Sequence, residues 1–446
     1  MVRLAAILFL LLTISCAVSH ASHAGQAAML SLDQALELAY QNNLGVQNAG
    51  LEVQKAADAI DAATTRFFPS LHFNGLESYN LTRQSYEFSR GTWGTYKEIG
   101  PVPPENVEVD TQIGFTTALS ATLSQPLSQL YRIDLSVEQR RIKKEMAAEE
   151  LRAKQQSVAK EVKDAYYQVL QKQSALAAIE ESIIFYRELD ALTERYLQEQ
   201  TVLKSEQLEV KTRLAKAELQ ALTHKNDLAD VKEQLNNLMG RDITTPFNVI
   251  QVPPRTDYEV DLEAAQALAL AQRPEIKESQ LKLRYAEHNR SIKKSEYIPD
   301  LWFKANYDKL YNVELLPNDV ATIGLLLRWE FYDWGRKQSE LAARSRDIQT
   351  AKNNVKETQD HVILQVNKIG RKLNEARARL KVAALSRATA REKLRIALQQ
   401  FGQKTVLLEN LLQAETDVME ANRQYEDALL GFWKTKAAFE NALGEA

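Results

Sequence analysis

The residues best suited to chemistry in this sequence are its six histidines, because imidazole serves as a metal ligand and as a general acid or base. Two of them lie near the start of the chain, and the other four are far apart, with no metal-ligand spacing. They are His20, His23, His72, His224, His288 and His361. The sequence also has no phosphate-binding glycine loop, nucleophile elbow or zinc-protease helix. We therefore predict a protein that is not an enzyme and has no catalytic, cofactor or metal site.

The charge balance excludes further classes of function. Charged residues make up 26% of the 446-residue chain, yet the formal net charge is only -3, which gives no basic surface for nucleic acid. The many Asp and Glu residues fit the solvated surfaces of helices better than a catalytic pair. Because the sequence has no nucleotide-binding motif, any energy that its function consumes must come from a partner protein.

The first residues have the layout of a secretory signal, and we assign 1–24 to a signal peptide. Arg3 precedes a short apolar run over 4–12, and small residues that suit cleavage follow the run. The run is too short for a transmembrane helix. Cys16, the only cysteine, has two interpretations: removal with the signal peptide, or a lipidated N-terminus after cleavage at Ser15. We expect the mature chain outside the cytoplasm and without a disulfide.

A strand of membrane length is predicted over 111–125. Apolar residues alternate there with small polar ones for a dozen positions, which is long for a soluble strand and suits a tilted crossing of a bilayer. Pro69 and Pro299 mark the starts of two similar strands, because proline ends helical geometry. The predicted strands cover 70–82, 111–125, 300–311 and 321–332, with a long loop over 84–110.

Each predicted strand has one apolar face and one polar face, as expected for a barrel strand between lipid and a watery lumen. The polar face carries His72, Asn74 and Lys304, which give no substrate signature. The apolar residues predicted to face lipid are Phe115, Leu119, Leu123, Leu325, Trp329 and Phe331.

Long stretches without proline or glycine, and with apolar residues at helical spacing, follow these strands. The predicted helices cover 32–66, 129–197, 203–239, 262–296, 334–400 and 406–443. Ser31 and Asp261 are the expected N-caps of two of them. The apolar stripe of 203–239 should pack on neighbouring helices.

The chain is predicted to contain an internal repeat. Shifting the sequence so that Leu32 meets Leu262 also aligns Pro69 with Pro299, and a second shift aligns Gly240 with Gly444. We assign 25–240 to repeat 1, 241–260 to a connector and 261–446 to repeat 2. Four strands cannot close a barrel, and open edges cannot face lipid, so at least two chains must share one barrel.

The sequence resembles the TolC-like outer-membrane efflux family over nearly all of the mature chain. The resemblance rests on paired segments in matching order: SLDQALELAYQNN with DLEAAQALALAQRPEI, RFFPSLHF with EYIPDLWF, LSQPL with LRWEFYDWG, and NLMG with NALG. It implies an α+β membrane protein: a homotrimer whose twelve-stranded outer-membrane β-barrel continues into a long periplasmic coiled-coil barrel. It also implies a passive exit duct for a tripartite pump or type I secretion, docked to a periplasmic adaptor and an inner-membrane transporter.

The turns at the ends of the long helices are where the family's docking and gating residues lie, and the sequence departs from the family there. The family's aromatic-x-x-Gly turn is missing after Tyr196 and Phe401, and Asn410 and Gln413 stand where some members carry two acids. The resemblance therefore leaves two interpretations open, a gating role or ordinary solvated helix surface. The candidate docking and gating residues are Tyr196, Gln200, Thr201, Phe401, Lys404, Thr405, Asn410 and Gln413.

Two alternatives to a general efflux duct stay open. The chain could be a periplasmic coiled-coil adaptor or scaffold in which the alternating segments form a small soluble β-structure. It could also be a duct specialised for metal-ion or protein export.

Overall fold

The computed structural model describes residues 28–111, 113–251, 261–313, 316–403 and 405–445. The predicted signal peptide with Cys16, Lys404 and most of the proline-rich end of the connector lie outside the described residues. The chain divides into two compact units, each built from three segments. Unit 1 contains 1–39, 161–256 and 380–433, and unit 2 contains 40–160, 257–379 and 434–446.

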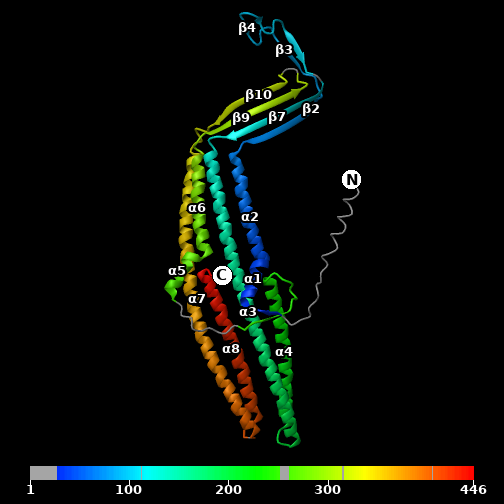
Figure 1. Cartoon of the computed structure of the whole chain (residues 1–446), viewed down its shortest axis with the longest axis vertical. Coiled ribbons are helices and arrows are strands. Elements are labelled where there is room, and N and C mark those ends of the chain that lie inside the picture. Colours follow the sequence, from blue (N-terminus) through cyan, green and yellow to red (C-terminus); the bar gives the residue numbers. More distant parts are fainter. Residues whose placement is uncertain (1–27, 112, 252–260, 314–315, 404, 446) are drawn as a thin grey trace, which may run out of the picture. The chain divides into compact units, whose positions relative to one another are not determined.

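A four-stranded antiparallel sheet lies in unit 2, in the order β10-β9-β7-β2 (Figure 1). Its strands are β2 (Ser70–Asn80), β7 (Gly114–Pro126), β9 (Asp300–Tyr311) and β10 (Asp319–Arg328). Pro69 and Pro299 stand immediately before β2 and β9, where a ring without an N–H ends the preceding helical segment. The predicted extension of the last strand to residue 332 is wrong, because its partner β9 begins at Asp300, which already pairs with Arg328.

Two helices expected to be continuous are broken. The predicted helix 32–66 is α1 (Leu32–Asn42), α2 (Leu44–Thr64) and a 3-10 turn, η1 (Thr65–Phe67). Asn43 interrupts it, because its side chain accepts hydrogen bonds from the backbone N–H groups of Gly45 and Val46 and so begins a new helix. The predicted helix 262–296 is likewise α5 (Leu262–Gln272) and α6 (Pro274–Ser295). Pro274 is the first residue of α6, a position where its missing N–H costs nothing.

The predicted loop 84–110 contains regular structure that alternation does not reveal. β3 (Ser85–Phe88) pairs with β6 (Val107–Asp110), and β4 (Thr95–Tyr96) pairs with β5 (Gly100–Pro101). Gly91, Gly94 and Gly100 have positive φ, which lets so short a segment turn repeatedly.

The long helices are α3 (Leu130–Gln198), α4 (Lys204–Leu238), α7 (Arg336–Gly402) and α8 (Leu408–Leu443), and all but α4 contribute residues to both units. Gly240 and Gly444 follow α4 and α8 at φ 65° and 87°, the left-handed conformation in which helices commonly end. No helix among the described residues has the length and apolar character needed to cross a membrane.

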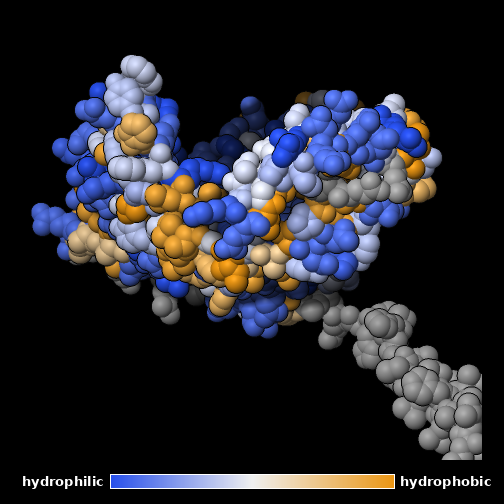
Figure 2. Space-filling view, turned by 90° about the horizontal axis from the view of Figure 1, so that it is seen from above, coloured by the Kyte–Doolittle hydropathy of each residue, from blue (hydrophilic) through white to orange (hydrophobic). Residues whose placement is uncertain are grey.

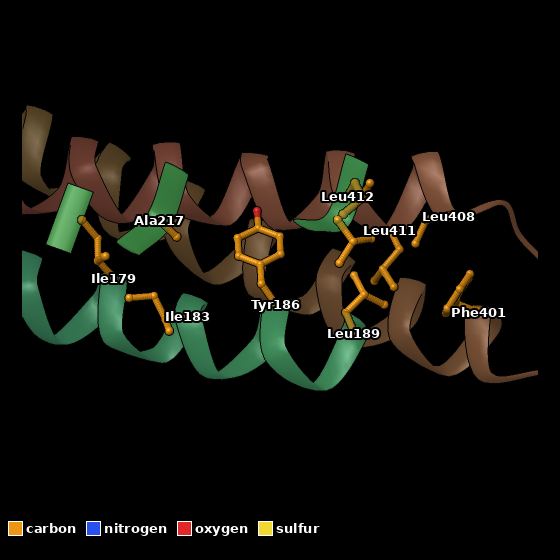
Figure 3. Close-up of a cluster of buried hydrophobic side chains, with 10 residues drawn as sticks. Ile179, Ile183, Tyr186, Leu189, Ala217, Phe401, Leu408, Leu411 and Leu412 are labelled. Atoms are coloured by element: carbon orange, nitrogen blue, oxygen red, sulfur yellow. The ribbon is translucent and has the colours of Figure 1, made fainter. Parts of the chain in front are cut away.

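Unit 1 has a hydrophobic core between its long helices (Figure 3). Leu189 of α3 lies beside Leu411 of α8, Tyr186 comes next along α3, and Phe401 of α7 lies at one end of the cluster. The apolar stripe predicted for α4 is only partly buried in the chain: Val231 and Leu235 are buried, whereas other members are exposed. Leu219 and Leu222 are the exposed members.

A short parallel ribbon also belongs to unit 1, where β1 (Ala28–Leu30) pairs with β8 (Phe247–Val249). Tyr166 of α3, fully buried, holds the ribbon through its hydroxyl group. That hydroxyl lies 2.8 Å from the carbonyl oxygen of Ile250 and 3.0 Å from that of Leu30, and it accepts a hydrogen bond from the Ile250 N–H at 3.1 Å.

Replacing Tyr166 by Phe should lower the thermal unfolding midpoint, because the variant removes the hydroxyl that bonds the Ile250 carbonyl, whereas the Ile250 N–H keeps its bond to the Leu30 carbonyl. The expected loss is about 1–3 kcal/mol of unfolding free energy. Tyr131→Phe, at a tyrosine that is 55% exposed, is the matched control and should melt like the parent. The measurement is the thermal unfolding midpoint, monitored by circular dichroism. Equal midpoints for the two variants would contradict the role given to the Tyr166 hydroxyl.

Candidate functional site

The four-stranded sheet has one nearly continuous apolar face, which the register defines. Residues directly opposite one another on antiparallel strands share a face. One row joins Leu71, Leu123, Ala305 and Ile323, and the next joins Phe73, Ala121, Tyr307 and Ala321. Phe303 with Leu325, and Leu301 with Leu327, extend the same face towards the start of β9. The alternation predicted strand by strand is therefore in phase across all four strands.

The opposite face is polar over three consecutive rows. These rows are Ser70–Ser124–Lys304–Gly324, His72–Thr122–Asn306–Thr322 and Asn74–Ser120–Asp308–Val320. Apolar rows border them at both ends, Leu76–Ala118–Leu310 on one side and Pro126–Trp302–Leu326 on the other. Leu326, an apolar residue on this otherwise polar face of β10, therefore belongs to a boundary row.

The apolar face ends in polar groups beside the turn between β9 and β10. Asp319 accepts a hydrogen bond from the Tyr307 hydroxyl at 2.7 Å and forms an ion pair with Lys309 at 3.0 Å. On the neighbouring hairpin the ring of Tyr79 packs edge-on against Phe115, with centroids 4.9 Å apart. The apolar surface is therefore a band with a defined limit on the side of the strand-connecting loops.

The residues predicted to face lipid lie on or next to this apolar face. Phe115 and Leu325 are exposed there, and Leu119 and Leu123 are partly covered by their neighbours. Trp329 and Phe331 come after the end of β10, with their rings 6.2 Å apart. Tyr332 and Trp334 follow in a second ring pair. All four of these aromatic side chains are exposed in the single chain.

Exposed hydrophobic residues are too many to be isolated surface side chains. In the space-filling view they gather in contiguous patches between hydrophilic ones (Figure 2). Patches of this kind mark interaction surfaces in soluble and membrane proteins alike. Among the described residues, β2 and β10 each pair on one side only, so they are the edge strands of this sheet.

The two tip turns, after α3 and after α7, share one hydrogen-bond pattern in unit 1. The Thr201 N–H and hydroxyl both donate to the Tyr196 carbonyl, at 2.9 and 3.0 Å. Thr405 makes the same two bonds to the Gln400 carbonyl, at 3.0 and 2.9 Å. Gln200 has φ 56°, the left-handed conformation that the first turn requires.

The structure brings together only some of the predicted docking and gating residues. The rings of Tyr196 and Phe401 lie 6.1 Å apart, and both contact the hydrophobic core of unit 1. Asn410 and Gln413 are exposed on α8, and the Gln413 amide donates to Asp417 at 2.8 Å. The other candidates, Gln200, Thr201 and Thr405, are exposed on the turns.

Sequence reasoning missed the most prominent apolar residues of these turns. Leu203 and Leu407 stand two residues after the threonines, and each is 68% exposed. The Leu203 N–H donates to Glu206 at 2.7 Å, which fixes the start of α4. The repeated Thr-Val-Leu triplet was the available signal, because it places one leucine identically at both turns.

The described residues contain no group of three or more His, Cys, Asp or Glu side chains that could hold a metal ion. The candidate sites in the described part of the chain are the two-faced sheet and the pair of tip turns that present leucines.

Solved structures share this fold. The chain is similar to the outer-membrane channel OprN, with TM-score 0.75 and 16% identity over 93% of this chain and 90% of that one. It is also similar to the CmeC channel of Campylobacter jejuni, with TM-score 0.72, 15% identity and coverage of 93% and 85%. VceC of Vibrio cholerae has TM-score 0.71, 14% identity and coverage of 93% and 96%. A comparison with curated protein sequences finds no match.

A protein-family model identifies the chain directly. The model of the outer membrane efflux proteins matches residues 35–241 and 266–445, most of the chain. It confirms the predicted relationship to TolC-like channels and the location in the cell outer membrane with an extension into the periplasm. With its two-faced sheet and its long helices, this chain belongs to the outer membrane efflux protein family.

Proposed function

We propose that three copies of the chain form a passive exit duct. In this duct four strands from each copy close a twelve-stranded outer-membrane β-barrel, and the long helices close a coiled-coil tunnel across the periplasm. Cargo passes through the duct without being chemically changed. The chain acts by enclosing a watery path rather than by catalysis.

The observation that carries this proposal is the two-faced sheet. Its apolar rows suit lipid and its polar rows suit a watery lumen, and the outer edges of β2 and β10 have no strand partner among the described residues. Joining β10 of one copy to β2 of the next would pair those edges, and four strands from one chain are too few to close a barrel alone.

Exposed apolar residues on the long helices also support the proposal of a tunnel shared between copies. In unit 1 leucines and a valine remain exposed along α4 and α7, although they follow helical spacing. They are Leu208, Leu219 and Leu222 on α4, and Val382 and Leu385 on α7. We propose that the α4 stripe of one copy packs on α7 of the next.

We also propose that the chain is an internal duplication, with repeat 1 over 25–240, a connector over 241–260 and repeat 2 over 261–446. The order of elements supports it, because α1, α2, β2, β7, α3 and α4 are followed by α5, α6, β9, β10, α7 and α8. Residues 1–24 remain a proposed signal peptide, and Cys16 a possible lipidation site.

The tip turns are the proposed docking surface for a periplasmic adaptor, which would connect the duct to an inner-membrane transporter. Both turns present an exposed leucine beside a backbone that a threonine hydroxyl fixes, and exposed apolar side chains of this kind suit a protein–protein contact. The assembled machine would be a tripartite efflux pump or a type I secretion system.

The experiment that tests the duct is the molar mass of the protein extracted in detergent from an outer-membrane fraction, measured by light scattering. The detergent-corrected mass should be three times the chain mass of 50.5 kDa, less the signal peptide. A water-soluble monomer or dimer would instead support a periplasmic adaptor or scaffold and would overturn the proposal.

A further inference from the structure

A cavity between α3 and α8 in unit 1 has no role in the function proposed so far. Its volume is ≈ 510 Å³, which lies in the range of sites for small organic ligands. Leu170 of α3 and Leu429 and Leu430 of α8 form an aliphatic part of its wall, and Gln251, which follows β8, lines it as well. Packed protein interiors contain few voids larger than a water molecule, so a cavity of this size is a candidate ligand site.

Three aromatic side chains also line the cavity. Tyr167 of α3 stacks on Trp433 of α8, with ring centroids 5.2 Å apart and planes 15° from parallel, and both residues are buried. Tyr425 of α8 is the third. The faces of aromatic rings attract cations, and pockets with several rings are used to recognise quaternary ammonium ligands. The aromatic wall therefore favours a ligand with a positive charge.

Among the described residues, Glu426 of α8 is the only charged side chain that lines this cavity. The side chain is 18% exposed, and its ion-pair partner Arg387 of α7 is 4.0 Å away, too far for a hydrogen bond. Burial raises the pKa of the Glu426 carboxyl, Arg387 lowers it, the charge of Asp427 raises it and that of Arg391 lowers it. Because this carboxylate is desolvated and only loosely paired, a cation placed in the cavity would stabilise it.

Arg387 shows the ligand chemistry that these groups accept. Its guanidinium carbon lies 3.4 Å from the centre of the Tyr425 ring, so a cation of the chain itself already lies on this ring and near Glu426. In the described part of the chain no lysine, arginine or histidine lines the cavity, so an anion would find no opposite charge there. The aliphatic wall adds the requirement of an apolar body.

We propose that this cavity binds a monovalent organic cation with an apolar body. Its charge would lie beside Glu426, and its body would pack against the leucines and the aromatic rings. The inference goes beyond the proposed duct and does not depend on the number of copies, because every described lining residue belongs to one chain.

The test is equilibrium dialysis of radiolabelled tetraphenylphosphonium against the protein extracted in detergent, with protein-free micelles as the blank. Tetraphenylborate has the same shape and the opposite charge, so it separates recognition of a cation from general binding to apolar surface. We expect saturable binding of tetraphenylphosphonium and none of tetraphenylborate. Glu426→Gln keeps the size of the side chain and removes its charge. It should weaken binding about tenfold or more, because a buried ligand charge then has no partner.

Two further variants complete the test. Asp427→Asn is the matched control, because Asp427 is 51% exposed, pairs with Arg423 at 3.2 Å and should not contribute to binding. Gln251→Lys is informative if Glu426→Gln does not fold. Gln251 is exposed, and a lysine there would bring a tethered cation to the same cavity, so this variant should also bind more weakly.

Equal binding of the two ions would overturn the site, and so would parental affinity in Glu426→Gln or Gln251→Lys. An equal loss in Asp427→Asn would show that the cation responds to the general negative charge of α8, and it would overturn the site as well. None of these results bears on the duct. A protein that binds the cation as proposed but has the mass of a monomer would support the site and overturn the duct.

Discussion

Replacing Ile323 by Arg should abolish stable insertion of the protein into the outer membrane. Ile323 is 78% exposed in the chain and lies in a central apolar row of the sheet, opposite Ala305. An arginine on the lipid-facing side of a barrel costs about 2–4 kcal/mol at the bilayer midplane. A trimer would carry this cost three times. The measurement is the amount of trimer in the outer-membrane fraction, resolved on a gel without heating.

The neighbouring residue provides the control. Thr322→Arg introduces the same side chain one position earlier, on the polar face in the row of His72 and Asn306. A charge there would face a watery lumen, so this variant should insert at nearly the parental level. Equal losses for the two variants would show that arginine damages the strand in general, and the assignment of the two faces would fail.

The second large effect is expected at the tip turns. The double variant Leu203→Asp, Leu407→Asp should lose binding to the proposed periplasmic adaptor while still forming the proposed trimer in the outer membrane. Truncating a hot-spot residue commonly costs 2 kcal/mol or more, and about 1.4 kcal/mol is tenfold in affinity. A loss well above tenfold is therefore expected when both leucines are replaced by charged residues.

Site-specific photo-crosslinking in intact cells measures this effect. A photoreactive residue at Gln200, exposed on the first turn, should give an adduct with a periplasmic adaptor that mass spectrometry identifies. The adduct should disappear in the double variant and persist in Leu316→Asp, where an exposed leucine in the β9–β10 loop receives the same change. An unchanged adduct in the double variant would show that the two leucines are not part of the docking surface.

The strands were predictable because their signals are local. Pro69 and Pro299 mark two of the starts and period-2 alternation indicates the faces, so β9 has the predicted bounds and β2 begins where predicted but ends at Asn80 instead of residue 82. The helix breaks were harder to predict. Asn43 interrupts a good apolar periodicity through a cap made by one side chain, and the periodicity itself continues into α2. Pro274 was a visible signal, and its position as the first residue of α6 could have been inferred.

Contacts between residues far apart in the chain could not be predicted from the sequence, for a different reason. Ser182 and Glu415 are far apart along the chain, and nothing in their own neighbourhoods predicts that they meet. The exposed Glu420 and the buried Glu415 look alike in the sequence, because both lie in a helix rich in charged residues. Only the packing of α3 against α8 distinguishes the solvated acid from the desolvated one.

The pairing of distant strands has a consequence for the timing of folding. β1 and β8, and also β7 and β9, join segments from opposite halves of the chain. Pairs with such long sequence separation form slowly, because loop closure must occur before any contact compensates for it. An exported chain with this topology therefore cannot mature progressively as it emerges. β1 and the free edge of β7 must wait for β8 and β9 from the later half, and during that interval the apolar rows of the first hairpin are open to aggregation. We expect the newly exported chain to depend on a periplasmic holding chaperone until its second hairpin arrives.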